Sequence, residues 1–381
     1  MAVYPKEKCK GNWVVRYDAG YSSVTGKRIQ KQRSGFKTKK EALAFLRAVE
    51  EQKAVLDEKF CEEPSLDPFK DFVVEWFNTE YKLEVGETTF ENRKYMLPKH
   101  LIPYFNTTPI GKITYKDLNA FYAQKVEKEK LSEKTVREMH HILSMAFQYG
   151  VEEGLLKANP AKKAKPPKPK GKEINPWTYD SVIKFLDQVE GTNRDAIYFL
   201  AVFSGMRRGE LLGLKWTDIN LGEGIISVQR SLAYTSKKGL FLKNPKTKSS
   251  RRRIEISHLV VEKLKEHKIK QNLHKKQMGN EYEDQDLVFP NIMGKLADPR
   301  KLLRDFYKQM SRAGVPRITF HDIRHTHATL LLLNGENPKV VQERLGHADI
   351  SVTLNIYAHV LPGMQKKAAD KMEEAYLKNK K

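Results

Sequence analysis

A proline- and lysine-rich segment divides the chain near its middle and limits how the chain can fold. Residues 159–176 read NPAKKAKPPKPKGKEINP. The prolines are incompatible with a helix and the lysines repel one another, so an extended tether is expected. We therefore predict folded parts on either side, joined by a linker at residues 161–176. Its charge suits a plain linker and a tether that crosses a phosphate backbone equally well.

Residues 65–160, before this linker, predict an all-helical domain. Apolar residues recur at helical spacing in residues 67–81, 113–130 and 132–154. In the third segment, Ser132 is the expected N-cap and Gly154 the expected stop. Its apolar stripe consists of Val136, Met139, Ile142, Leu143, Ala146 and Phe147. Such a stripe is typical of a helical core.

Residues 1–58 predict a smaller unit, a three-stranded sheet followed by one helix. Two stretches, GNWVVRYDAG and GKRIQKQRSGF, alternate apolar or aromatic residues with polar ones between glycine-containing turns. Thr38 and Glu41 form a possible capping box for the helix. The exposed strand face would carry Arg28, Lys31, Arg33 and Lys37. These cations suit DNA phosphates or a major groove, and a solubilising face is the alternative.

The charge balance points to a large anionic partner. The 381 residues include 69 Lys and Arg against 47 Asp and Glu, a formal net charge of +22. Nucleic acid is the usual large anion of a cell. Further DNA contacts are expected from Lys134, Lys168, Lys170 and Arg251. The two cysteines lack the companions of a zinc site, and no signal peptide or membrane span is visible. We therefore expect a cytoplasmic protein.

Residues 177–381 predict a mixed, mostly helical domain with a small antiparallel sheet. Helical patterns occur in residues 179–190, 195–205, 209–219, 318–335 and 337–346. Residues 224–232 and 251–257 alternate like strands. The C-terminal tail predicts a helix with Ala368, Met372 and Tyr376 on one face.

Three separated clusters in this last domain contain residues suited to phosphate chemistry. Arg207 and Glu210 follow a glycine turn at Gly205; His321 and Arg324 lie on one face of a helical turn; His347 follows a glycine ten residues before Tyr357. Lys246 lies where a hairpin turn is expected. Each cluster alone is weak, since single charged residues are usually surface groups. The histidines near Arg324 lack companions at ligand spacing, so we predict no metal site.

Together and in this order, the clusters resemble the catalytic domain of tyrosine recombinases, the phage integrase family. The matching motifs are Gly205-Met206-Arg207-Arg208-Gly209-Glu210, Lys246, His321-Asp322-Ile323-Arg324, Leu345-Gly346-His347 and Tyr357. The spacing from Gly205 selects Arg207 over Arg208. Lys246, followed by Thr247, matches the family pattern better than its competitors, Lys243 and Lys248.

The resemblance implies a role for each of these residues. Tyr357 would attack a DNA phosphate and form a 3′-phosphotyrosyl intermediate. Arg207 and Arg324 would bind the phosphate oxygens, and His347 would donate a hydrogen bond to them. Lys246 would protonate the leaving 5′ oxygen, and His321 would exchange a proton with the tyrosine. Glu210 would orient the site. Because one phosphoester replaces another of similar energy, neither ATP nor a metal cofactor is required.

The resemblance also covers the rest of the chain, more loosely. Residues 65–160 look like the family's core-binding domain. Residues 1–58 look like the arm-binding domain of integrases from phages and conjugative transposons of Gram-positive bacteria. The resemblance implies that the chain acts on double-stranded DNA with core and arm sites and forms a homotetramer on that DNA. It also implies an excisionase and a host DNA-bending protein as partners. The tail would reach a neighbouring subunit or pack on its own domain.

Two other functions remain open at this stage. A type IB topoisomerase shares the catalytic group, and it would relax supercoils rather than join two specific sites. An inactive architectural or regulatory DNA-binding protein would lack the nucleophile or an arginine, and here none is missing.

Overall fold

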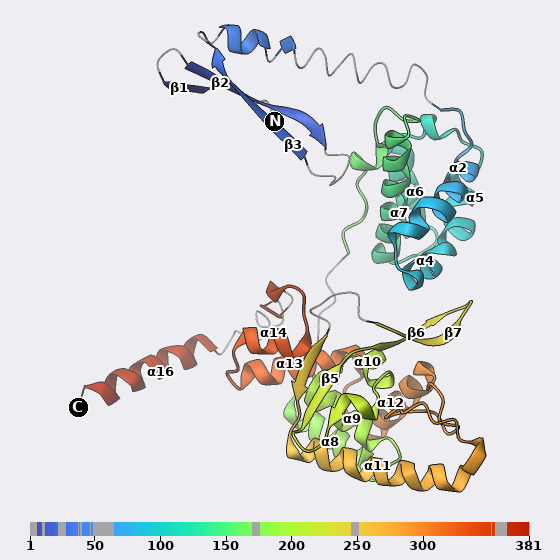
Figure 1. The fold of residues 1–381 in the computed structure, drawn as a ribbon, viewed down its shortest axis with the longest axis vertical. Coiled ribbons are helices and arrows are strands. Elements are labelled where there is room, and N and C mark those ends of the chain that lie inside the picture. Colours follow the sequence, from blue (N-terminus) through green and yellow to red (C-terminus); the bar gives the residue numbers. More distant parts are fainter. Residues whose placement is uncertain are drawn as a thin grey trace. The chain divides into compact units, whose positions relative to one another are not determined.

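The chain forms two compact units, Met1–Lys170 and Gly171–Lys381. The computed structural model describes residues 6–9, 12–21, 28–36, 38, 40–45, 47–48, 65–169, 176–244, 251–351, 353–354 and 364–380. The fold is mostly helical with small antiparallel sheets (Figure 1), which confirms the predicted fold class at that level. Among the described residues, no helix is long and apolar enough to cross a membrane. Four predicted site residues lie outside the described residues: Lys37, Lys170, Lys246 and Tyr357.

The first unit begins with a three-stranded antiparallel sheet in the order β1-β2-β3. Its strands are β1 (Lys6–Cys9), β2 (Asn12–Tyr21) and β3 (Arg28–Phe36). Thr38 Oγ1 accepts a hydrogen bond from the Glu41 amide at 3.2 Å, so it caps the short helix that follows. Phe45 of that helix lies 5.3 Å from the Phe36 ring. This aromatic contact joins the helix to the sheet.

Residues 65–169 of the first unit are mostly helical around a core rich in aromatic side chains. Its longest helices are α6 (Tyr115–Glu127) and α7 (Glu133–Glu152). The six residues of the predicted stripe on α7 are all buried, and Ser132 caps the helix as predicted. The shorter elements are α2 (Phe69–Trp76), the π-helices Phe77–Tyr81 and Leu97–Leu101, α3 (Lys82–Glu84), α4 (Glu87–Lys94), α5 (Ile102–Phe105) and the 3-10 turns Ile110–Lys112 and Pro160–Lys162.

The start of the proline-rich segment contacts this helical part. Ala161 is buried, and Asn159 donates a hydrogen bond to the Ser144 carbonyl at 2.9 Å. The Lys165 amide donates to Asn119 Oδ1 at 2.7 Å. Residues 159–165 are therefore anchored to α6 and α7, while Lys168 is exposed.

The second unit packs helices around one large core and carries two small sheets. Its helices are α8 (Tyr179–Val189), α9 (Asp195–Ser204), α10 (Arg208–Leu212), α11 (His258–Met278), α12 (Pro299–Ala313), α13 (Phe320–Leu333), α14 (Pro338–Leu345) and α16 (Met364–Asn379). Its strands are β4 (Ile219–Asn220), β5 (Ile225–Val228), β6 (Ser231–Thr235), β7 (Gly239–Lys243) and β8 (Arg252–Glu255). The sheet orders are β4-β5-β8 and β6-β7. Short 3-10 turns span Trp216–Asp218 and Gly279–Glu281.

One expectation for this unit needs correction. The helix predicted for residues 209–219 ends at Leu212, because the backbone after Gly213 is extended. The Leu214 carbonyl accepts from the Val288 amide at 2.9 Å, and Lys215 forms a β-bridge with Leu287. The sequence analysis also predicted neither α11 nor α12. α11 buries only Val260, Val261 and Leu264, so it lacks a long apolar stripe.

Candidate active site

Two helix ends that are far apart in the sequence meet at the site. α9 ends at Ser204 and α14 ends at Leu345, and the glycine that follows each helix, Gly205 or Gly346, adopts left-handed backbone, with φ of 63° and 67°. A Cβ on Gly205 would lie 2.6 Å from Leu345 Cδ2 and 2.7 Å from His327 Cδ2. Glycine at position 205 is therefore required both by the backbone angle and by the close packing of the two turns.

A small apolar cluster holds the second of these turns in place. Ala328 and Leu332 of α13 are packed and fully buried against Val341 and Leu345 of α14. The cluster fixes the end of α14, and with it the start of the segment that carries His347. The predicted Leu-Gly-His motif is thus positioned by ordinary helix packing.

Arg324 joins the two turns from α13. Its side chain donates from Nη1 to the Gly205 carbonyl at 2.9 Å and from Nη2 to the Leu345 carbonyl at 2.5 Å. The residue is only 2% exposed. Burial, followed by the positive charges of Arg207 and Arg252, lowers its pKa to about 9. Arg324 therefore stays protonated at neutral pH, and a bound anion would stabilise its buried positive charge.

Arg207 lies beside the same turns, at the start of α10. Its Nη1 donates to Glu210 Oε1 at 2.8 Å, and its Nη2 donates to the Gly346 carbonyl at 3.4 Å. Its backbone amide donates to Glu210 Oε2 at 2.9 Å. Both predicted catalytic arginines are thus tied to the backbone just before His347.

Glu210 is a buried carboxylate shared by two arginines. Arg252 of β8 donates to it from Nη1 at 3.2 Å and from Nη2 at 2.9 Å, a two-pronged contact. Burial alone would raise the pKa of Glu210, but hydrogen bonds and charges from Arg252 and Arg207 outweigh it and lower the pKa to about 2. The side chain is ionised at neutral pH, and both of its oxygens accept hydrogen bonds from arginine side chains.

His347 and His321 complete the group, and both are electrically neutral at neutral pH. His347 Nδ1 lies 2.9 Å from Thr353 Oγ1. Burial, together with the charges of Arg324 and Arg207, lowers the His347 pKa to about 4. His321 is exposed, and its ring stands perpendicular to that of His325 with centroids 4.9 Å apart. Partial burial and the neighbouring positive groups lower its pKa as well.

A second layer of residues that the sequence analysis missed supports these groups. Arg344 donates to the Glu255 and Phe203 carbonyls, each at 2.9 Å. Its own carbonyl accepts from Arg252 Nε at 2.8 Å. His327 Nδ1 bonds the Val202 carbonyl at 2.9 Å, and Arg344 Nε donates to His327 Nε2 at 3.2 Å. Arg344 and His327 therefore link α9, β8, α13 and α14.

We expect His327→Gln to make folding less sensitive to acid. Burial lowers the His327 pKa from 6.5 to about 3, so between these values the unfolded chain binds a proton that the folded chain does not. The contribution of neutral His327 to the free energy of unfolding is therefore fully present above pH 6.5. It is lost as the pH falls, by up to about 1.4 kcal/mol per pH unit. Glutamine can replace both hydrogen bonds without titrating.

The measurement is urea-induced unfolding of both proteins at about pH 7.5 and about pH 5.5, followed by tryptophan fluorescence. The wild-type chain should lose more stability between these pH values than His327→Gln. Equal losses of stability in the two proteins would show that protonation of His327 does not contribute to the acid sensitivity of the fold.

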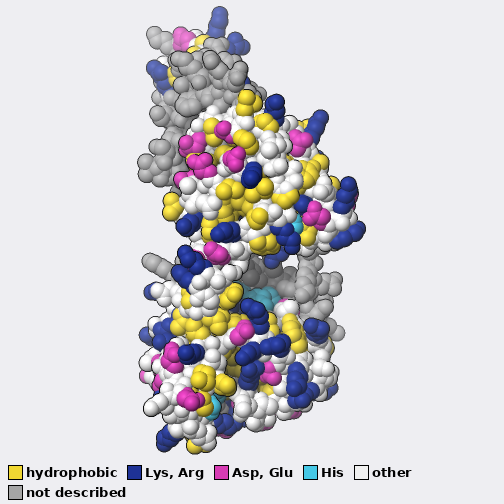
Figure 2. All heavy atoms as spheres, turned by 90° about the vertical axis from the view of Figure 1, so that its right-hand side faces the viewer, with side chains coloured by type: hydrophobic (Ala, Val, Ile, Leu, Met, Phe, Trp, Pro, Cys, Tyr) yellow, Lys and Arg dark blue, Asp and Glu magenta, His cyan; other side chains and the backbone are white. Residues whose placement is uncertain are grey.

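The structure brings together five of the predicted site residues in the second unit: Arg207, Glu210, His321, Arg324 and His347. On the face drawn in Figure 2, histidine side chains reach the surface of this unit beside a group of Lys and Arg side chains. Among the predicted DNA contacts, the side chains of Arg33, Lys134, Lys168 and Arg251 are exposed. The backbones of Arg28 and Lys31 lie in β3. Within the described part of the chain, no group of three or more potential ligands is arranged to hold a metal ion.

Three family models match successive parts of the chain. Residues 174–364 match the phage integrase family. Residues 3–53 match an arm DNA-binding domain, and residues 68–126 match the N-terminal SAM-like domain of phage integrases.

Relatives named as recombinases or integrases extend the similarity to most of the chain. A XerC-like tyrosine recombinase of Caldanaerobacter subterraneus is 35% identical over 273 residues, 67% of this chain and 70% of the relative. The ICEBs1 integrase of Bacillus subtilis is 28% identical over 372 residues, 96% of this chain and 97% of the relative.

Solved structures share the fold. The Tn1549 transposon integrase bound to a circular intermediate DNA matches with a TM-score of 0.67 at 20% identity, over 80% of this chain and 99% of that one. A lambda integrase tetramer bound to a Holliday junction matches with a TM-score of 0.57 at 18% identity, over 91% of this chain and 92% of that one.

Proposed function

Because the chain belongs to the phage integrase family of tyrosine recombinases, we propose that Tyr357 is its nucleophile and that the residues around Arg207 and Arg324 activate the scissile phosphate. The chain is a site-specific DNA recombinase. One observation carries the assignment of the site: both arginines are hydrogen-bonded to the Leu345–Gly346 backbone, immediately before His347. Two cations held in this way can face one phosphate.

The proposed reaction exchanges one phosphoester for another. The Tyr357 oxygen attacks the phosphorus, the bond to the 5′ oxygen breaks, and a 3′-phosphotyrosine and a free 5′ hydroxyl result. Arg207 and Arg324 stabilise the charge that builds up on the non-bridging oxygens. His347 donates a hydrogen bond to the phosphate, and neutral His321 accepts the tyrosine proton. Lys246 gives a proton to the leaving oxygen.

We propose that the parts before the catalytic domain hold the DNA. The matches of residues 3–53 and 68–126 support an arm-binding domain at 1–58 and a core-binding domain at 65–160, with a linker at 161–176 and the catalytic domain at 177–381. Arg28, Lys31, Arg33 and Lys37 would contact arm sites. Lys134, Lys168 and Lys170 would contact the DNA near the core. Arg33 also lies over the Phe45 ring, 4.8 Å from its centroid.

The enzyme is proposed to act as a homotetramer on two duplexes. The lambda integrase tetramer, which shares this fold, supports a multimer. An excisionase and a host DNA-bending protein are proposed to set the direction of the reaction.

A covalent-trapping experiment tests the function. The wild-type chain is incubated with a nicked, end-labelled duplex that carries the attachment core, in EDTA and without ATP. The nick lets the cut fragment diffuse away, so the covalent complex should accumulate as a protease-sensitive shifted band with a free 5′ hydroxyl. Tight binding to the same DNA without such a band would favour the architectural DNA-binding protein instead.

A further inference from the structure

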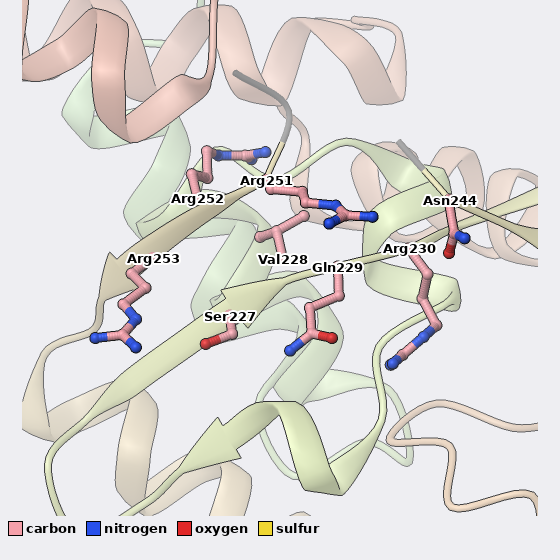
Figure 3. Close-up of a pocket in the computed structure, with 8 residues that line it drawn as sticks. All are labelled: Ser227, Val228, Gln229, Arg230, Asn244, Arg251, Arg252 and Arg253. Atoms are coloured by element: carbon pink, nitrogen blue, oxygen red, sulfur yellow. The ribbon is translucent and has the colours of Figure 1, made fainter. Parts of the chain in front are cut away.

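A groove rich in arginine opens beside the candidate active site. Its volume is about 490 Å³, and four arginines line it: Arg230, Arg251, Arg252 and Arg253. Ser227, Gln229 and Asn244 add neutral hydrogen-bonding groups, and no described lining residue carries a carboxylate. Figure 3 shows these side chains around the ends of β5 and β8, and we call the cavity the arginine groove.

Two of the four charges are already neutralised by buried acids outside the groove. Arg230 forms an ion pair with Asp218, whose side chain is 3% exposed. Arg252 forms the buried pair with Glu210 described above. Among the residues that the structure describes, Arg251 and Arg253 have no carboxylate partner, and both are exposed. The groove therefore has an excess of two positive charges.

Strand alternation explains why adjacent arginines differ in this way. Arg252 pairs with Val228 across the β5–β8 ladder, and both residues turn inward, to the core and Glu210. Arg253 pairs with Ser227 on the opposite face. Arg252 and Arg253 leave the strand in opposite directions, and Arg251 extends over Gln229 toward Asn244 (Figure 3). β8 thus directs Arg252 toward the active site, whereas Arg253 on β8 and Arg251 just before it line the groove.

We propose that the arginine groove binds two backbone phosphates of the DNA duplex, distinct from the scissile phosphate, one through Arg251 and one through Arg253. The guanidinium fork matches a phosphate in two-pronged geometry, and Gln, Asn and Ser are common neutral donors to the same oxygens. The proposal rests on the proposed function, because the duplex must lie on the catalytic arginines. Phosphates follow one another at about 3.4 Å of rise along a strand, so a duplex held there offers others within a few nucleotides.

The test measures how DNA binding depends on salt. Each phosphate contact contributes a slope of about −0.9 to the plot of log K against log salt concentration. The probe is a fluorescent duplex of about 30 base pairs of arbitrary sequence, titrated by anisotropy between about 50 and about 200 mM NaCl. Arg251→Gln should weaken binding by about tenfold at low salt and reduce the slope by about one. Adding Arg253→Gln should reduce it further, whereas Arg251→Lys should keep the wild-type slope.

A matched control separates a local contact from the loss of any positive charge. Lys276 is exposed near the C-terminal end of α11, away from β5 and β8 (Figure 1). Lys276→Gln changes the net charge by the same amount and should leave the slope unchanged. Equal slopes for Arg251→Gln, Lys276→Gln and wild type would overturn the proposal. Unchanged slopes combined with weaker assembly on DNA would also overturn it and would assign the groove to an acidic surface of another subunit.

The outcome is independent of the reaction test. If the wild-type chain forms the covalent band but Arg251→Gln keeps the wild-type slope, only the groove proposal fails. If the wild-type chain forms no covalent band, the proposed function fails whatever the salt slopes are.

Discussion

Tyr357→Phe is expected to abolish the covalent protein–DNA complex while leaving DNA binding intact. Phenylalanine lacks the oxygen that forms the phosphotyrosyl bond, and no other group in the proposed mechanism can replace it. The rate of strand cleavage should fall by at least about 10⁴-fold. The cations that bind the DNA backbone are unchanged, so the affinity for the duplex should stay at the wild-type level.

The measurement is the nicked-duplex gel, run beside an anisotropy titration of the same DNA. Tyr376→Phe is the matched control, because Tyr376 is an exposed tyrosine in the same C-terminal region, on α16. It should form the covalent band as the wild-type chain does. A band that persists in Tyr357→Phe would move the nucleophile to another tyrosine, and loss of the band in both variants would point to damage to the tail.

The motifs identified which residues lie at the site, but they did not predict the packing that positions these residues. Gly205, His321, Arg324 and His347 were found by residue type, order and spacing. Each of these signals is local, and a helix turn or a glycine turn preserves it in the fold. The meeting of the α9 and α14 ends is not local, because it depends on packing between residues more than a hundred positions apart.

Arg252 shows most clearly what the sequence could not decide. It lies in a run of three arginines, and the sequence analysis selected Arg251 as a DNA contact without assigning Arg252 a role. Which arginine turns inward depends on the register between β5 and β8, and a shift by one residue would exchange their roles. Arg344 was missed for a similar reason, since its partners are two backbone carbonyls and the His327 ring, and no motif encodes these contacts.

Glu210→Gln is expected to have the largest effect on stability and to impair cleavage as well. The Glu210 side chain is 6% exposed and lies between Arg207 and Arg252, whose side chains are 36% and 5% exposed. Removing one partner of a buried ion pair typically costs about 3–5 kcal/mol, because the remaining charge is left without compensation. Arg207 also loses its 2.8 Å anchor, and a displacement of about 1 Å at a reacting group can lower a rate by about 10²-fold.

The acid sensitivity of the fold should change in the same variant. The pKa of Glu210 falls from 4.5 to about 2 on folding, so its stabilising contribution is present above pH 4.5 and is lost as the pH falls toward 2. Glu210→Gln should therefore lose less stability than the wild-type chain over that range. Glu223→Gln, which alters an exposed carboxylate between β4 and β5, is the control and should behave as wild type.

A double variant separates a positioning role from a purely structural one. Arg252→Gln combined with Glu210→Gln removes both members of the buried pair, so urea unfolding should show much of the lost stability restored. Single-turnover cleavage of the nicked duplex should stay low, because Arg207 still lacks its carboxylate. If cleavage recovers together with stability, Glu210 only supports the fold. If stability recovers and cleavage does not, the carboxylate acts by holding Arg207 where the phosphate binds.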